Sequence, residues 1–393
     1  MRLRWLGLWT LALAGSMALA QPTPAPAAAP APVLAKDLRE SVHEIDVTVQ
    51  DLYGRREQRR IPLTVFRPSG TGPFPVLVLN HGRAGTAAER AQPPRIRFEQ
   101  QARYFAGKGL AVIVPTRVGY GQTQIDSFDP ESNGGCGQAQ IGPMSQAASE
   151  QVLAAIEWAR GQPDLDVQRW WVAGISVGGL TSVATVMRAP AGLQGGINFS
   201  GGTGGSPKER PGQPCGVVQI AQYWQAHAAK ARVPMLWLYW ENDLYWGAEH
   251  PRRWHQAYTA GGGQAEWAQL GPISGDGHLG FTRDMDRWTP LADAFFARAG
   301  LTQPALPPVP PSSGFAALED VQRLPGLGNA GRDLYRRFLT SATPRAFAIG
   351  PSGQSGFATG DWAVGKALGF CQARTGVRCQ LYAVDDQVVW RAP

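Results

Sequence analysis

The sequence predicts an α/β domain with a mostly parallel, doubly wound sheet, an antiparallel hairpin before it and a small α+β domain after it. Six apolar runs without polar alternation are separated by helical segments, a pattern typical of strands that helices cover on both faces. A proline-rich stretch over residues 303–313 then marks a boundary, because such a stretch forms a stiff linker. The six runs span residues 75–79, 110–115, 170–174, 195–199, 234–240 and 265–270.

Residues 1–20 predict a cleavable secretory signal peptide. A basic start is followed by a short apolar run over residues 5–14 and by small residues before a cut near Ala20. The apolar run is shorter than the roughly 20 residues of a membrane span, which disfavours the alternative of an anchor. The start has neither a twin-arginine pair nor a cysteine for a lipid. We therefore expect Sec-type export to the periplasm or the medium, with no membrane span after cleavage.

A leader and a hairpin precede the apolar runs. Residues 21–40 form a Pro/Ala-rich leader without hydrophobic periodicity, which predicts an extended segment outside the folded domain. Two alternating runs follow, over residues 45–49 and 61–65. They predict a β-hairpin with one buried face, which begins a main domain over residues 41–302.

Helical segments lie between the apolar runs, as a parallel sheet requires. Residues 98–108 and 146–160 are two of them. In the second, Val152, Ile156 and Trp158 are near helical spacing.

The run over residues 170–174 leads directly into Gly174-Ile175-Ser176-Val177-Gly178, the pattern Gly-x-Ser-x-Gly. An apolar strand precedes it and small helix-forming residues follow, and the pattern occurs once in the chain. This context predicts a nucleophile elbow, in which the serine sits on a sharp turn between strand and helix. The alternative is a solvent-exposed Gly/Ser turn.

A nucleophilic serine needs a base, and the base needs an acid that fixes its tautomer. His278 is the expected base, because it lies in a glycine-rich loop directly after the last apolar run; a surface histidine is the alternative. Asp243 is the expected acid, in the turn after the preceding strand. Glu241 and Asp276 are the alternatives for this role.

Two backbone N–H groups should stabilise the oxyanion of an attacked carbonyl. We expect them from Val177, directly after the serine, and from Arg83, in the loop after the first apolar run. The side chains of Arg83 and Arg117 are candidates for holding a substrate carboxylate, with solvated arginines as the alternative. Tyr245 and Trp246 follow the acid and are candidates for lining an aromatic or sugar-accepting cleft.

The four cysteines form an even set in an exported chain, which predicts disulfides. Cys371 and Cys379 are close in sequence, and Cys136 and Cys215 then pair by elimination. The loops of the second pair belong to the predicted catalytic edge, so we expect this disulfide to pin a lid or wall over the site. Metal ligation is the alternative, but no Cys-x-x-Cys or histidine cluster accompanies the cysteines, so no metal is expected.

These residues together resemble the dienelactone hydrolase-like branch of the α/β hydrolases, exported members in particular. The resemblance covers about residues 41–301 and implies the α/β-hydrolase fold, with the chain order Ser176, Asp243, His278 and no cofactor. Dienelactone hydrolases use a cysteine nucleophile, whereas position 176 is serine. The resemblance therefore implies a serine esterase of the same architecture. It rests on Asn80-His81-Gly82, the elbow over residues 174–179, residues 198–202, the strand over residues 236–243 and Gly277-His278.

Residues 314–393 predict a small α+β domain with one disulfide. Helices are expected through residue 341, a strand over 345–349, a helix over 361–374 and a last strand over 379–390. This part resembles short disulfide-bearing appendages of bacterial exported proteins, and that resemblance implies no activity.

The sequence therefore predicts an exported serine hydrolase that cleaves small-molecule carboxylic esters through an acyl-enzyme. The formal net charge of +7 is scattered without a basic block, so nucleic acid is not an expected partner; the sequence predicts no oligomeric state. One alternative is a peptidase resembling the prolyl oligopeptidase group, although no propeller repeat is present. Another is a non-catalytic binding protein on a hydrolase fold, against which the complete Ser-Asp-His set argues.

Overall fold

The computed structural model describes residue 35 and residues 38–68, 71–124, 128–301, 312–343, 345–360, 363–373 and 379–392. The predicted signal peptide lies outside these residues. So do most of the predicted leader and most of the predicted linker.

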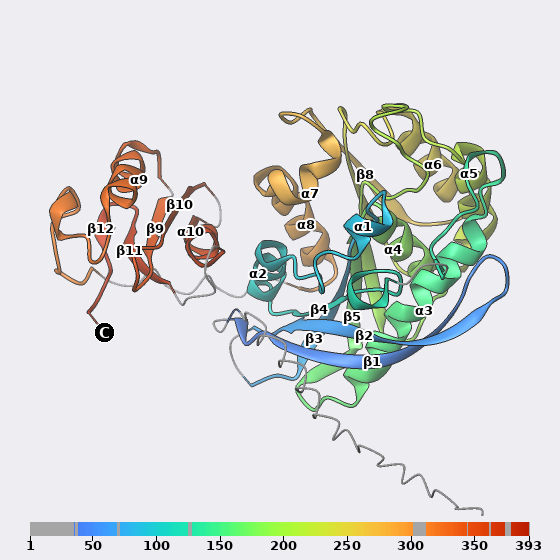
Figure 1. Ribbon diagram of the computed structural model, residues 1–393, viewed down its shortest axis with the longest axis horizontal. Helices are drawn as coiled ribbons and strands as arrows, with labels where there is room; N and C mark the ends of the chain where they lie inside the picture. Colours follow the sequence, from blue (N-terminus) through green and yellow to red (C-terminus); the bar gives the residue numbers. More distant parts are fainter. Residues whose placement is uncertain are drawn as a thin grey trace, which may run out of the picture. The chain divides into compact units, whose positions relative to one another are not determined.

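Among the described residues, the main sheet has eight strands in the order β1-β2-β4-β3-β5-β6-β7-β8 (Figure 1). The neighbouring pairs from β4 to β8 are parallel, whereas β2 runs antiparallel to both β1 and β4. Each of the six apolar runs forms one of these strands, and the predicted hairpin is β1 with β2. The strands are β1 Ser41–Gln50, β2 Arg56–Phe66, β3 Phe74–Asn80, β4 Ala111–Pro115, β5 Leu165–Ile175, β6 Leu193–Phe199, β7 Met235–Trp240 and β8 Ala265–Leu270.

Helices cover both faces of this sheet, and each face has its own apolar core. Helices α3, α4, α5 and α6 pack on one face, and α2 and α8 pack on the other. This arrangement explains why the central strands lack polar alternation. The helices are α1 Ala87–Arg90, α2 Glu99–Gly107, α3 Ile141–Arg160, α4 Val177–Met187, α5 Val217–His227, α6 Glu249–Ala260, α7 Gly280–Arg283 and α8 Met285–Arg298.

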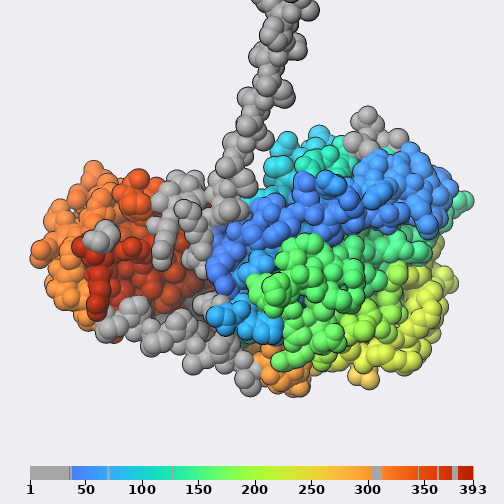
Figure 2. Space-filling view, turned by 90° about the horizontal axis from the view of Figure 1, so that it is seen from below, coloured from blue at the N-terminus to red at the C-terminus, as the bar shows by residue number. Residues whose placement is uncertain are grey.

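The hairpin differs from its prediction in one strand. In β1, buried and exposed residues alternate from Ile45 to Gln50, as expected for one buried face. In β2, residues 61–66 are all buried, because this strand lies between β1 and β4 and packs against both cores. The hairpin, blue in Figure 2, lies along the green middle part of the chain.

The strand order and the strand-turn-helix from β5 to α4 give the chain the α/β-hydrolase fold. In such a sheet the carboxyl ends of the parallel strands lie at one edge, where ligands bind. The residues after β3, β4, β5, β6, β7 and β8 therefore meet at that edge, and they include every predicted site residue.

The last part of the chain forms a second, antiparallel sheet in the order β10-β9-β11-β12. The strand predicted over 345–349 and the helix predicted near 361–374 are present. The sequence did not predict β10, and the single strand expected over 379–390 is two short strands around a turn at Asp385, which has a φ of 49°. A disulfide joins Cys371 and Cys379. The elements are α9 Asn329–Thr340, β9 Arg345–Ile349, β10 Ser355–Thr359, α10 Ala363–Gln372, β11 Gln380–Val384 and β12 Gln387–Val388.

Helices that combine the length and the apolarity needed to span a membrane do not occur in the described part of the chain.

Candidate active site

Ser176 lies on the turn between β5 and α4. Its φ and ψ are 59° and −124°, a strained conformation that non-glycine residues rarely adopt and that is typical of functional turns. The flanking glycines make the turn fit. A Cβ on Gly174 would lie 2.2 Å from the carbonyl oxygen of Gly178, and one on Gly178 would lie 2.2 Å from the carbonyl oxygen of Asn80. Helix α4 can therefore pack this closely against β5 and β3 only because both positions lack a side chain.

The structure brings Asp243 and His278 together. The Nδ1 of His278 lies 2.9 Å from Oδ2 of Asp243, and both side chains are buried. The other oxygen of Asp243 accepts the backbone N–H groups of Tyr245 (2.8 Å) and Trp246 (3.1 Å). A carboxylate only accepts, so Nδ1 of His278 carries the proton and Nε2 is left with a free lone pair. The two alternative acids do not reach this ring: Glu241 is exposed, and Asp276 bonds only to backbone.

Asp276 and Asn242 connect two loops, a function that the sequence did not indicate. One is the loop after β8, which carries His278 (the histidine loop), and the other is the loop after β7, which carries Asp243 (the acid loop). Asp276 accepts the backbone N–H groups of Leu244 and His278, each at 2.9 Å. The amide nitrogen of Asn242 donates to two carbonyl oxygens of the histidine loop, at 2.8 Å each. Each of the two loops thus anchors the other, which fixes the position of the imidazole.

Gly82, the residue directly before Arg83, lies beside Ser176. A Cβ on Gly82 would lie 3.1 Å from Cβ of Ser176. Within the described residues, the backbone N–H groups of Arg83 and Val177 have no hydrogen-bond partner. Both donors are therefore available to an oxyanion formed at Ser176.

Ser176 and His278 are not hydrogen-bonded in this structure. Catalytic hydrogen bonds are often long without substrate and shorten when it binds.

Tyr245 and Trp246 both pack against the ring of His278. The Tyr245 ring stacks on the imidazole with centroids 4.0 Å apart, and the Trp246 ring meets it edge-on at 5.3 Å. Trp246 is buried, and its indole N–H donates to the carbonyl oxygen of Ser200 at 2.7 Å. Trp246 therefore supports the imidazole from inside the protein, whereas Tyr245 remains half-buried at the site.

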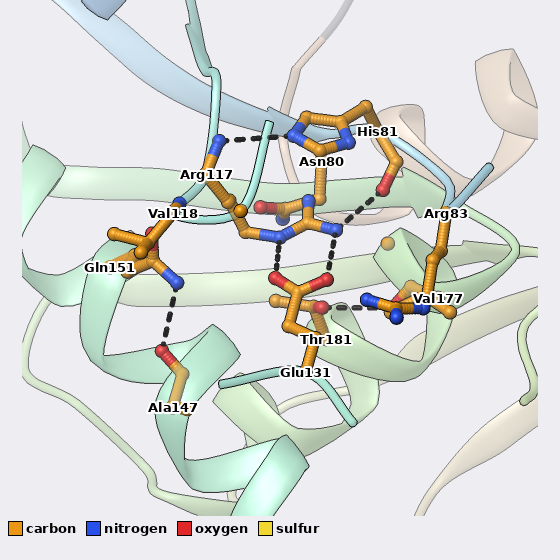
Figure 3. Close-up of polar contacts among 12 residues, drawn as sticks. Asn80, His81, Arg83, Arg117, Val118, Glu131, Ala147, Gln151, Val177 and Thr181 are labelled. Atoms are coloured by element: carbon orange, nitrogen blue, oxygen red, sulfur yellow. Dashed lines mark hydrogen bonds and ion pairs between the residues drawn. The ribbon is translucent and has the colours of Figure 1, made fainter. Parts of the chain in front are cut away.

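The two arginines that were candidates for holding a substrate carboxylate are already paired with acidic residues, and Figure 3 shows the pair of Arg117 with Glu131. Arg117 is fully buried, and its Nε lies 2.5 Å from Glu131. The guanidinium of Arg83 forms two hydrogen bonds with Asp129, one of them at 2.9 Å. Burial opposes the charge of each arginine, but the paired carboxylates outweigh this effect and raise both pKa values. These charges therefore stabilise the loop after β4.

The predicted disulfide between Cys136 and Cys215 is present. It joins the loop after β4 to the loop after β6, and Asn133 donates to Thr203 at 3.3 Å between the same loops. Both loops lie at the carboxyl edge of the sheet, beside the elbow.

The described residues contain no group of three or more His, Cys, Asp or Glu side chains placed to hold a metal ion.

No protein-family model matches the sequence, and no curated protein matches it. Solved structures with a similar fold include an acylaminoacyl peptidase from Pyrococcus horikoshii, with 16% identity over 66% of this chain and a TM-score of 0.44. The chain spans 42% of that peptidase. A protein assigned as a dienelactone hydrolase from Klebsiella pneumoniae has 16% identity over 66% of this chain and 99% of its own, with a TM-score of 0.43. An esterase from Pyrococcus furiosus has 11% identity over 67% of this chain and 93% of its own, with a TM-score of 0.43.

Proposed function

We propose that the chain is an exported serine hydrolase that cleaves carboxylic ester bonds through an acyl-enzyme intermediate. The observation that carries the proposal is the strained turn at Ser176, which lies directly before Val177 and beside Gly82, the residue that precedes Arg83. Strain of this kind is retained where it positions a reacting group. The hydrogen-bonded pair of Asp243 and His278 adds a base that is held in the tautomer it needs.

In the first half of the reaction, Nε2 of His278 takes the proton of Ser176 Oγ while Oγ bonds to the ester carbonyl carbon. The carbonyl electron pair moves onto oxygen, where the N–H groups of Val177 and Arg83 stabilise the negative charge. Asp243 stabilises the imidazolium. When the carbonyl re-forms, the bond to the alcohol oxygen breaks and His278 gives its proton to that oxygen.

In the second half, water replaces the alcohol. His278 takes a proton from water as the oxygen attacks the acyl carbon, and the same N–H groups stabilise the second tetrahedral intermediate. The bond to Oγ then breaks, and His278 returns the proton to Ser176. The acid leaves and the enzyme is restored without a cofactor.

Export is part of the proposal. Residues 1–20 have the composition of a signal peptide, and both disulfides need a compartment that permits their oxidation. The mature chain is expected to begin after Ala20, which sequencing the N-terminus of the secreted protein will test.

Release of 4-nitrophenol from the acetyl, butyryl and octanoyl esters tests the activity. The mature protein is compared with Ser176→Ala and with Ser274→Ala, which changes an exposed serine of the histidine loop. We expect turnover by the wild type and Ser274→Ala and its loss in Ser176→Ala. Release of 4-nitroaniline from an N-acyl amino acid 4-nitroanilide tests the peptidase alternative. Turnover of the anilide alone supports a peptidase, and Ser176-independent rates on all substrates contradict both hydrolases.

A further inference from the structure

The ring of His81 is buried at the end of β3 and forms a hydrogen bond through each nitrogen. Its Nδ1 lies 2.7 Å from the carbonyl oxygen of Gly82. Its Nε2 lies 3.0 Å from the backbone nitrogen of Arg117, a contact that Figure 3 shows. A carbonyl oxygen only accepts and a backbone N–H only donates, so Nδ1 carries the proton and Nε2 accepts. The two partners therefore fix a single neutral tautomer.

The bond from Nδ1 orients the peptide between Gly82 and Arg83. This peptide is trans, and in a trans peptide the C=O and the N–H point in opposite directions. Because the carbonyl oxygen of Gly82 is turned to the His81 ring, the N–H of Arg83 points away from that ring. Gly82 borders the nucleophile, since a Cβ there would lie 3.7 Å from Oγ of Ser176.

Arg117 in turn binds both the ring and the backbone carbonyl oxygen of His81. Its backbone N–H donates to the ring, and its guanidinium donates to the carbonyl oxygen of His81 at 2.9 Å. The guanidinium is aligned by Glu131, whose two oxygens accept from Arg117 at 2.5 and 3.2 Å. Both charged side chains are fully buried, so each is held in place by the other.

The backbone around Arg117 is tied to helix α3. The N–H of Val118 donates to the side-chain oxygen of Gln151 at 2.7 Å, and the amide nitrogen of Gln151 donates to the carbonyl oxygen of Ala147 (Figure 3). Arg117 thus connects the rigid helix to His81. The positive charge of Arg117 also acts on the ring: together with burial, the larger effect, it holds the pKa of His81 well below its usual value.

We propose that His81 is a positioning residue of the oxyanion hole: held by the Arg117–Glu131 pair, it turns the Gly82–Arg83 peptide so that the N–H of Arg83 faces the developing oxyanion. This inference rests on the proposed ester hydrolysis. His81 acts through the peptide that it orients. An unpaired Gly82 carbonyl would leave this peptide free to turn its N–H away from the oxyanion.

Two substitutions separate the two bonds of the ring. In His81→Asn, the side-chain amide nitrogen is two bonds from Cβ, as Nδ1 is, so it can donate to Gly82 while the bond from Arg117 is lost. In His81→Gln, the side-chain oxygen is three bonds from Cβ, as Nε2 is, so it can accept from Arg117 while the bond to Gly82 is lost. Both variants lose the ring contact with Tyr120, whose centroid lies 4.3 Å away.

The expected difference lies in kcat. Removing one oxyanion donor lowers kcat by about 10²–10³-fold in a serine hydrolase, so we expect His81→Gln to lose about 10²-fold with little change in KM. His81→Asn should retain clearly more kcat than His81→Gln. The affinity for a phenylboronic acid, which forms a tetrahedral adduct with the serine, should fall in parallel with kcat. Equal losses in both variants, or a rise in KM at unchanged kcat, would overturn the proposal.

A nitrogen NMR spectrum of histidine-labelled wild-type protein tests the same point without activity or substitution. We expect His81 to remain neutral with its proton on Nδ1 between about pH 5 and 8, the range in which an ordinary histidine titrates. A proton on Nε2, or a charged ring in this range, would contradict the proposed orientation. If the wild type hydrolyses no ester while the ring has the expected tautomer, the proposed function fails and the geometry of the loop stands.

Discussion

Asp243→Asn is the substitution whose consequence follows most directly from the geometry. One oxygen of Asp243 accepts the N–H groups of Tyr245 and Trp246, and the other faces Nδ1 of His278. In the asparagine, only the oxygen can accept the two backbone bonds, so the NH2 group must face the imidazole. Because NH2 donates, Nδ1 must become the acceptor and the proton moves to Nε2. The base then has no lone pair for the proton of serine.

The loss of kcat in Asp243→Asn should therefore be nearly as large as that caused by a complete change of the His278 tautomer. In serine proteases the equivalent change lowers kcat about 10⁴-fold, which corresponds to about 5.4 kcal/mol of transition-state stabilisation. The free energy of unfolding should change little, since both backbone bonds remain. Steady-state hydrolysis of 4-nitrophenyl butyrate and urea unfolding measure the two quantities on the same preparation.

Asp276→Asn is the matched control. The side-chain oxygen of Asp276 accepts two backbone N–H groups of the same loops, and an asparagine oxygen can accept both without changing the tautomer of His278. We expect this variant to keep its kcat within a few-fold of the wild type. Near wild-type kcat in Asp243→Asn, or an equal loss in Asp276→Asn, would refute the assignment of the acid.

Three further experiments test the elbow and its supporting loop. Gly178→Ala places a Cβ 2.2 Å from the carbonyl oxygen of Asn80, so we expect urea unfolding to show a loss of at least about 1–3 kcal/mol; unchanged stability would mean that strand and helix cross less closely. Arg117→Leu leaves Glu131 buried without its partner and should destabilise by about 3–5 kcal/mol, and Glu131→Leu in the same chain should recover most of this loss. In the wild type, His81 takes up a proton only in the unfolded chain, so the free energy of unfolding should fall on acidification below about pH 6.5. His81→Asn should reduce the slope of this fall by up to about 1.4 kcal/mol per pH unit. Parallel pH profiles of the two proteins would contradict the lowered pKa of His81.

The fold, the turn at Ser176 and the pairing of Asp243 with His278 could be predicted because their signals are local or depend on chain order. The apolar run before Ser176 and the small residues after it indicate the turn within about ten residues, a length over which strand and helix patterns are readable. Asp243 and His278 follow from the order of strands, since the carboxyl ends of parallel strands share one edge.

The side-chain partners could not be predicted in the same way. Arg83 and Arg117 do lie after strand ends, but Asp129 and Glu131 reach them from an insertion whose path the sequence does not specify. An exposed arginine at the carboxyl edge of the sheet and a buried arginine paired with a carboxylate have the same local sequence pattern. Only the folded loop decides between them.

Trp246 and the C-terminal strands illustrate two other limits. Trp246 was a candidate for lining the cleft because it follows a strand, yet a tight turn brings its indole N–H to Ser200 and buries the ring. Strand β10, Ser355–Thr359, contains serine, glycine and alanine, which have little β propensity, and pairing with β9 determines its conformation. Asp385 adopts a positive φ, and the turn that it forms divides the expected last strand in two. The flanking residues have high β propensity, so the sequence pattern does not reveal this turn.

Covalent capture of the acyl-enzyme tests the account most directly. The mature protein is mixed with 4-nitrophenyl acetate, quenched in acid within the first turnovers and mapped by peptide mass spectrometry. The account predicts a burst of 4-nitrophenol close to one equivalent when deacylation is slow, with the acetyl group on Ser176 and no such adduct in Ser176→Ala. An acetyl group on another residue, or the same turnover with no adduct at Ser176 under any quench, would contradict the proposed nucleophile.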